Sequence, residues 1–80
     1  MTKEQVIKDL QEIFIDVLDN ESIVLKDATN ANDIDEWDSL SNIQLIVAIE
    51  KHYKIKFNTQ EINSWKNILD LTNCILTKKA

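Results

Sequence analysis

The chain has 80 residues, which is enough for one domain and too few for two. Hydrophobic residues make up 44% of it, and it contains neither glycine nor proline. It therefore lacks the residue that takes the positive φ angles of tight β-turns at no steric cost, and helices are favoured over strands. Its 14 acidic residues against nine lysines give a net charge of −5, which opposes binding to nucleic acid or to an anionic membrane.

The first predicted helix lies at the start of the chain. Its apolar residues recur at intervals of three and four, which places them on one helical face: Val6, Ile7, Leu10, Ile13, Phe14, Val17 and Leu18. Thr2 is a suitable N-cap, and Gln5 three positions later completes a capping-box pattern. We expect this helix to end near Leu18, because a polar run begins at Asp19.

A segment without sustained periodicity extends from Asp19 to Asp38. Five apolar side chains are scattered through it and can anchor it to a core: Ile23, Val24, Leu25, Ile34 and Trp37. The segment is therefore predicted to be a long loop that packs on the helices. Loops longer than about 12 to 15 residues are uncommon unless they serve a function, so a functional residue is expected near its end.

The second predicted helix begins at Asp38-Ser39. Apolar residues occupy more than half of its circumference: Leu40, Ile43, Leu45, Ile46, Val47, Ile49 and Tyr53. This pattern is typical of a central helix that neighbours cover on several sides. The alternation from Tyr53 to Phe57 could form a strand, but the sequence offers no partner strand, so we interpret it as an extended connector.

Two further helices are predicted in the last third of the chain. Asn58 or Thr59 can cap a short third helix that ends near Ser64, and Asn67 can cap a fourth. The apolar residues expected to face inward are Ile62, Trp65, Ile68, Leu71, Cys74, Ile75 and Leu76. The sequence thus predicts an all-α fold of four helices in a single domain, residues 1–80, which we expect to be monomeric.

The sequence also bears on cellular location. The chain starts directly with an amphipathic segment, without an apolar signal region, and no run approaches 18 apolar residues. Its single cysteine, Cys74, cannot form an internal disulfide, which fits a reducing compartment, and is expected to be a small apolar residue of a buried face. We therefore expect a cytoplasmic protein without a membrane span.

Nucleophilic catalysis is disfavoured by the position of the one histidine. His52 lies 13 residues after Ser39 on the same predicted helix, a distance of about 20 Å at 1.5 Å per residue. It cannot act as the general base of that serine. A helical domain of this size also offers no obvious pocket for paired carboxylates, and the two tryptophans are interpreted as core anchors. No enzyme activity is expected.

A metal site is disfavoured by the spacing of the acidic residues. Four carboxylates lie close together in the sequence: Asp33, Asp35, Glu36 and Asp38. Counted from Asp33, a calcium-binding loop would need an oxygen ligand where Trp37 stands and a glycine where Asp38 stands. The cluster is better interpreted as a solvated loop whose charge lies before a helix N-terminus, where carboxylates are stabilising.

Ser39 is the remaining candidate for chemistry. Alone, Asp38-Ser39-Leu40 is a common helix-start sequence, in which the aspartate accepts hydrogen bonds from the first free amides. Its context favours a function, because Ser39 follows the long loop, begins the most apolar helix and lies near the midpoint of a small acidic chain.

The segment Glu36–Tyr53, which holds this motif and the apolar register after it, resembles the attachment-site loop and second helix of acyl carrier proteins. The resemblance continues through Ile55 and Phe57 and covers essentially the whole chain, since the other predicted helices also fall where that family's helices fall. It implies an acyl-carrier-like four-helix bundle, with a long loop between helices one and two and a short third helix, that has no catalysis of its own.

The resemblance also implies roles for residues. A phosphopantetheinyl transferase would move the 4'-phosphopantetheine group of coenzyme A onto Ser39, and the thiol of that arm would hold an acyl or aminoacyl group as a thioester. Asp38 and Leu40 would flank the cofactor, and Asp38 would assist the transferase. Leu40, Ile43 and Val47 would form or border the docking surface and the apolar space for an acyl chain. Ligases that load the arm and acyltransferases would be further partners.

The sequence departs from carriers of primary fatty acid synthesis, which have an acidic second helix that meets basic enzymes. The exposed positions of the second helix are expected to be Ser41, Asn42, Gln44, Ala48, Glu50, Lys51 and His52, of which only Glu50 is acidic. The usual glycine two residues before the serine is also absent, with Glu36 and Trp37 in that stretch. These departures favour a carrier for a specialised acyl-transfer or biosynthetic pathway.

Two alternatives stay open at this point. The run Ile43–Val47 and Trp65 also resemble aminoacyl carriers, such as those for D-alanine, that an adenylating ligase serves. In the second alternative the chain is a helical interaction module without a carrier function, and Ser39 only begins a helix.

Overall fold

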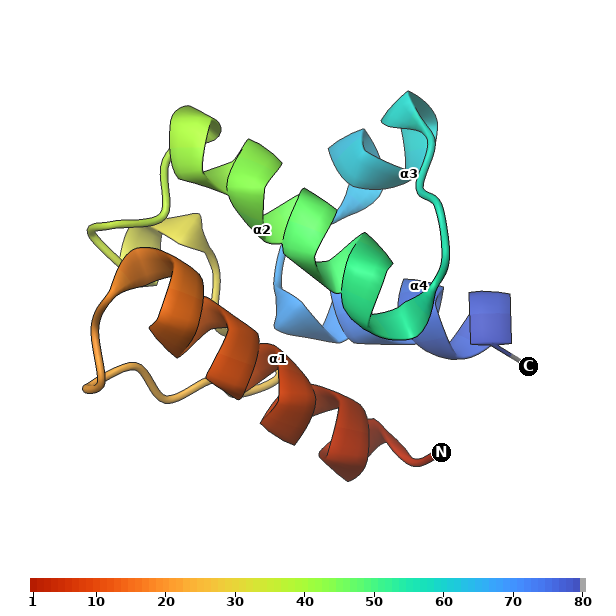
Figure 1. Cartoon of the computed structure of the whole chain (residues 1–80), viewed down its shortest axis with the longest axis horizontal. Coiled ribbons are helices and arrows are strands. Elements are labelled where there is room, and N and C mark those ends of the chain that lie inside the picture. Colours follow the sequence, from red (N-terminus) through yellow and green to blue (C-terminus); the bar gives the residue numbers. More distant parts are fainter. Residues whose placement is uncertain (80) are drawn as a thin grey trace.

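The computed structural model describes residues 1–79, which form helices and no strands (Figure 1). The elements are α1 (Lys3–Leu18), the 3-10 helix η1 (Ala31–Asp33), α2 (Ser39–Tyr53), α3 (Thr59–Ser64) and α4 (Ile68–Lys79). The all-α class, the long loop between α1 and α2 and the short α3 are confirmed. The short η1 within the loop was not predicted; the Asn30 side chain begins it by accepting from the amide of Asn32.

Helices α1 and α2 lie side by side and run in opposite directions, and α4 also packs on α1 (Figure 1). One core joins them. Each long helix contributes three aliphatic or aromatic residues, and the long loop adds three more: Val6, Leu10, Phe14, Leu45, Ile49, Tyr53, Ile68, Leu71, Ile75, Ile23, Leu25 and Ile34. The inward face predicted for α4 is confirmed at its three main positions, whereas Cys74, Leu76, Ile62 and Trp65 are half-buried.

Polar side chains close the N-termini of the helices. The predicted capping box of α1 is present, since Thr2 Oγ1 accepts from the amide of Gln5 and Gln5 Oε1 accepts from the amide of Thr2, at 3.2 and 3.1 Å. Asn58, one of the two candidates, caps α3 by accepting from the amide of Glu61 at 2.8 Å. Asn67 accepts an amide of the first turn of α4 in the same way.

Two helices end in the left-handed conformation although the chain has no glycine. Asp19 after α1 has φ 52°, and Lys54 after α2 has φ 57°. These positions commonly hold glycine, because a Cβ atom raises the energy of this region. The chain therefore forms these tight turns without glycine, with an aspartate and a lysine in the left-handed conformation.

The long loop is anchored by alternate side chains. Ile23, Leu25 and Ile34 are buried as predicted, but Val24 is 63% exposed, so its predicted anchoring role is wrong. In an extended stretch successive side chains point to opposite sides, and Val24 lies between two buried residues.

Hydrogen bonds tie this loop to the start of α4. The first amides of a helix have no intrahelical partner, and here the amide of Ile68 donates to the carbonyl of Thr29 at 2.8 Å and that of Leu69 to the carbonyl of Asp27 at 3.0 Å. Lys3 Nζ also reaches Asp27 Oδ2 at 2.9 Å. The loop that leads to Ser39 is thereby fixed to the starts of α1 and α4.

The prediction that neighbours cover α2 on several sides is wrong. Only Leu45, Ile49 and Tyr53 of this helix are buried. Three other apolar residues are exposed: Leu40, Ile43 and Val47. Helix α2 packs on α1 along one side and lies at the surface of the bundle along another. The predicted exposed positions are right for Gln44, Lys51 and His52, whereas four others are half-buried: Ser41, Asn42, Ala48 and Glu50.

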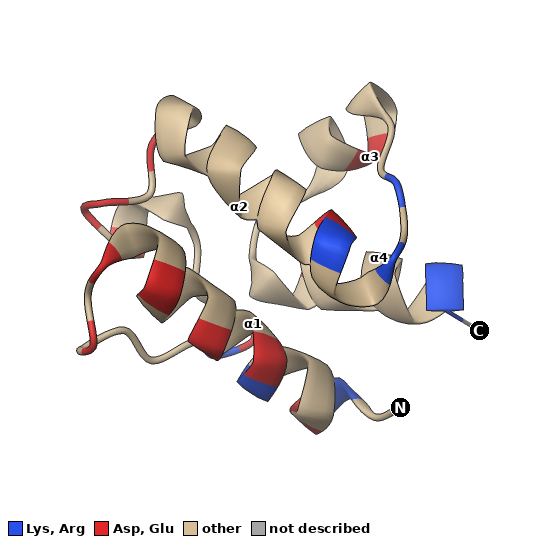
Figure 2. Cartoon of the chain, viewed as in Figure 1, with Lys and Arg blue, Asp and Glu red and all other residues tan. Residues whose placement is uncertain are grey.

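Charge is distributed unevenly along this fold. Residues 1–38 contain eleven acidic residues and three lysines, whereas residues 39–80 contain three acidic residues and six lysines. Figure 2 shows the acidic residues on α1 and on the loop that leads to α2, and basic residues at the C-terminal end of α2 and in the connector after it. The net negative charge of the protein therefore belongs to its N-terminal half.

Candidate functional site

Ser39 is the first residue of α2, and its neighbours form the cap of that helix. Asp38 Oδ1 accepts from the amides of Leu40 and Ser41, at 3.0 and 2.9 Å. Ser41 Oγ accepts from the amide of Asp38 at 2.9 Å and donates to the carbonyl of Glu36 at 2.7 Å. Both capping side chains flank Ser39, so its own hydroxyl is left out of the cap, and Ser39 is exposed.

Asp38 is held as a carboxylate at this helix start. The hydrogen bond from the amide of Ser41 is the main cause that lowers the pKa of the Asp38 carboxyl, and the amide of Leu40 acts in the same direction. Two amides that could have faced a bound anion are thus already paired with Asp38. A phosphate on Ser39 would still feel the positive end of the α2 dipole, but not these two donors.

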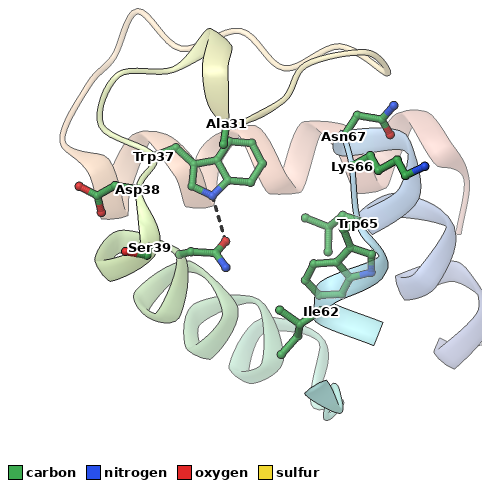
Figure 3. Close-up of a pocket in the computed structure, with 10 residues that line it drawn as sticks. Ala31, Trp37, Asp38, Ser39, Ile62, Trp65, Lys66 and Asn67 are labelled. Atoms are coloured by element: carbon green, nitrogen blue, oxygen red, sulfur yellow. Dashed lines mark hydrogen bonds between the residues drawn. The ribbon is translucent and has the colours of Figure 1, made fainter. Parts of the chain in front are cut away.

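A cavity of about 250 Å³ opens beside Ser39, although the sequence suggested no obvious pocket in so small a helical domain. Its walls come from the loop, the start of α2, α3 and the start of α4 (Figure 3). The lining residues are Ala31, Trp37, Asp38, Ser39, Asn42, Ile62, Trp65, Lys66, Asn67 and Leu71. Ser39 therefore stands at a surface that can receive a group attached to it.

Two tryptophans face each other across this cavity (Figure 3). Trp37 packs edge-on against Phe14 with ring centroids 4.9 Å apart, and its Nε1 donates to Asn42 Oδ1 at 2.9 Å. Trp65 packs edge-on against Phe57 at 4.8 Å. Both rings are anchored to the core, as predicted, and they also form the apolar walls of the cavity, which was not predicted.

The residues expected to serve partner docking lie on the outside of the molecule. Leu40, Ile43 and Val47 are 71%, 62% and 43% exposed, and none of them lines the cavity beside Ser39. The cavity itself is bounded by the loop, α3, the start of α4 and the two tryptophans.

Other reactive side chains lie away from Ser39. His52 is at the far end of the continuous helix α2, with its Nε2 3.6 Å from Asp9 Oδ2. Burial raises the pKa of the Cys74 thiol, whose Sγ lies 3.7 Å from Glu61 Oε2. Within residues 1–79, no three side chains of the metal-binding types lie close enough to hold an ion. No helix in the same range is long and apolar enough to cross a membrane.

Comparison with known proteins identifies this arrangement. Residues 8–75 match the family described as "Phosphopantetheine attachment site". This chain belongs to the acyl carrier protein family. It is 29% identical over 79 residues to the acyl carrier protein of Petrotoga mobilis and 30% identical over 79 residues to that of Cyanidium caldarium. Both comparisons cover 98% of this chain, and they cover 92% and 91% of those two proteins.

A solved structure shares the fold at closer identity. The solution structure of a holo acyl carrier protein from Geobacter metallireducens superposes with a TM-score of 0.87 at 49% sequence identity, over 91% of this chain and 84% of that one. Covalently attached 4'-phosphopantetheine is accordingly the cofactor of this carrier. Carriers of this family are generally not catalytic, and they generally meet phosphopantetheinyl transferases and enzymes that handle acyl groups.

The residues around Ser39 fit this cofactor. The serine hydroxyl is exposed and free of the helix cap, and the cavity beside it has indole walls. Asn42, whose Oδ1 accepts from Trp37, keeps its amide N–H donors available to the cavity that it lines. A linear arm with amide groups suits a site of this kind, because its methylenes can lie on the rings and its carbonyl oxygens can accept from such donors.

Sequence reasoning missed the cavity-lining residues other than the Asp-Ser pair. Asn42 was assigned to the exposed side of α2 but is half-buried, and Asn67 was identified only as a helix cap. A signal was available in Trp37, because a large aromatic directly before a surface motif is an unusual loop residue. That signal does not identify its partner Asn42, which depends on how the loop meets the helix.

Proposed function

We propose that this protein is an acyl carrier whose 4'-phosphopantetheine arm is attached to Ser39 and which serves a specialised acyl-transfer or biosynthetic pathway. The thiol of the bound arm supplies the thioester chemistry. The observation that carries the proposal is the position of Ser39, exposed at the start of α2 and at the rim of the cavity.

The chain's own residues have separable roles in this proposal. Asp38 and Ser41 hold the first turn of α2, so the Ser39 hydroxyl stays available to a transferase. That hydroxyl would attack the phosphorus of coenzyme A next to the pantetheine, 3',5'-adenosine bisphosphate would leave, and the transferase would take the serine proton. The ionised Asp38 stands beside this bond and would assist the transferase, with Leu40 on the other side of the serine.

Electrostatics support a specialised pathway. Glu50 is the only acidic residue among residues 39–53, and its carboxylate accepts from the amide of Phe57 at 2.9 Å. It is half-buried and held toward the connector after α2. An enzyme whose basic patch is complementary to an acidic second helix has no exposed carboxylate to bind along α2. Its association with this protein would be slower and less specific.

Intact mass after incubation with coenzyme A and a broad-specificity phosphopantetheinyl transferase tests the attachment. We expect the mass of one phosphopantetheine to be gained by the wild type and not by Ser39→Ala, with the fold of the variant retained. Ser22→Ala is the matched control, because it removes an exposed hydroxyl away from the cap of α2 and should leave the modification of Ser39 unchanged. No gain in the wild type, or a gain that survives in Ser39→Ala, would contradict the assignment.

A loading screen of the modified protein tests the cargo. ATP-dependent acyl ligases and amino acid ligases are offered in parallel, and loading is measured by intact mass. We expect acyl groups to be loaded. Loading by an adenylating amino acid ligase alone would instead make this an aminoacyl carrier of the D-alanyl type.

A further inference from the structure

Three exposed apolar residues form a continuous row on α2, which we name the α2 stripe: Leu40, Ile43 and Val47. Their spacing of three and four residues places them on one helical face. Five large hydrophobic residues are exposed in the described chain, and three of them belong to this stripe. A gathering of exposed apolar side chains on one face is typical of a protein contact surface.

The stripe ends in a basic groove. At the C-terminal end of α2 a shallow groove is lined by Val47, Glu50, Lys51, Lys54, Ile55 and Lys56. Its three lysines are exposed, and within residues 1–79 none of them pairs with a carboxylate. The carboxylate of Glu50 is engaged by the amide of Phe57. The groove therefore presents a local positive charge in a protein whose net charge is −5.

We propose that the α2 stripe and its basic end, Lys51, Lys54 and Lys56, together dock a partner protein that offers an apolar groove flanked by carboxylates. The proposal rests on the proposed function, because the stripe begins next to Ser39 and a partner bound there has the arm within reach. Complementary charge would speed the encounter, and the three lysines would repel a partner with a basic flank even where the apolar surfaces match.

The acidic N-terminal half of the chain determines how a bound partner is oriented on the α2 stripe. Residues 1–38 carry a net charge of −8 and residues 39–80 carry +3. The carboxylates cluster on α1 and the loop, and the lysines lie beyond the far end of the stripe (Figure 2). A partner with an acidic flank is thus attracted to one end of the stripe and repelled by the surface near α1, which fixes its orientation on the helix.

A pair of synthetic amphipathic helical peptides tests the sign of the charge that flanks the partner's apolar surface. The two peptides share one leucine face, which glutamates flank in one peptide and lysines in the other, and each is titrated into the isotope-labelled unmodified protein. We expect the glutamate-flanked peptide to bind the stripe about fivefold to tenfold more tightly at low salt, with the largest amide shifts within residues 40–56. Raising the salt to about 300 mM should remove most of this preference.

Charge-matched variants supply the control. Lys54→Glu with Lys56→Glu should abolish or reverse the preference. Lys8→Glu with Lys26→Glu changes the charge equally on the acidic half, where both lysines are exposed, and should leave the preference unchanged. The net charge of −5 by itself favours the lysine-flanked peptide, so a preference for glutamate reports the local groove.

Three results would overturn the proposal. These are equal or tighter binding of the lysine-flanked peptide at the stripe, binding of the glutamate-flanked peptide elsewhere, and concentration-dependent shifts of the free protein that show a second copy on the stripe. Because the protein is unmodified in these titrations, failure here leaves the Ser39 assignment standing, whereas failure of Ser39 to be modified is seen only in the intact-mass experiment and removes the role of the stripe in bringing a partner to the arm.

Discussion

Replacing Thr72 by valine should stabilise this protein. Thr72 lies on α4, is fully buried, and its Oγ1 has no hydrogen-bond partner among the described residues. Threonine and valine have nearly the same shape and the same branch at Cβ, so the exchange replaces a buried hydroxyl by a methyl group of similar size.

The expected gain follows from the desolvation of that hydroxyl. Burying a hydroxyl without a partner costs about 1–3 kcal/mol, and this cost disappears in the variant, while the added methyl is buried favourably. We expect the free energy of unfolding to rise by about 1–2 kcal/mol. For a domain of this size, each kcal/mol corresponds to an increase of about 4–8 °C in Tm.

Urea unfolding followed by far-ultraviolet circular dichroism measures the effect, and an unchanged slope with denaturant would show that the gain is one of stability. Thr77→Val is the matched control on the same helix, because Thr77 is exposed and its Oγ1 donates to the carbonyl of Asn73 at 2.9 Å. It should not gain stability. If Thr72→Val is no more stable than the wild type, the hydroxyl is satisfied and the reasoning is refuted.

Two further predictions concern the contact of α2 with α1 and the helix start beside Ser39. Tyr53→Phe removes the hydrogen bond from Tyr53 Oη to Asp9 Oδ2, 3.0 Å long, and should lower the free energy of unfolding by about 1 kcal/mol. Modification at Ser39 should be unchanged; unaltered urea unfolding of the variant would show that this bond adds nothing. The folded pKa of Asp38 lies below its unfolded value, so its carboxylate contributes stability that is present above about pH 4 and is lost as the pH falls through the folded pKa. The stability advantage of the wild type over Asp38→Asn should therefore shrink as the pH is lowered from about 6 to about 3, and an advantage that stays constant over this range would argue against the capping charge.

Local signals predicted the helices well. The apolar period and the polar run that follows it predicted α1 and its end at Leu18, and the polar residues Thr2 and Asp38 marked two helix starts that the structure closes with capping boxes. Such features depend on residues within one turn of each other, so the sequence alone contains the interaction that decides them.

The exposed side of α2 and the cavity could not be predicted from the sequence, because they depend on how the helices and the long loop pack together. A helix with apolar residues around most of its circumference is predicted to be buried. The period of these residues does not show which side of the helix has no neighbour. In this protein that side holds Ile43 and Val47. The cavity depends on Trp37 and Trp65, which are distant in the sequence and line the same cavity because the loop is tied to α4.

The start of α2 shows how modification and stability are kept apart. If Ser39 were itself the N-cap, its hydroxyl would accept an amide hydrogen bond, and esterification would disturb the first turn. The cap is instead formed one position earlier by Asp38 and closed by Ser41. Ser39 adds no hydrogen bond to this cap, so both its replacement by alanine and the attachment of an arm can leave the helix intact. The same shift places its side chain outside the capping network and beside the cavity, where an attached group can turn inward or face a partner on the α2 stripe.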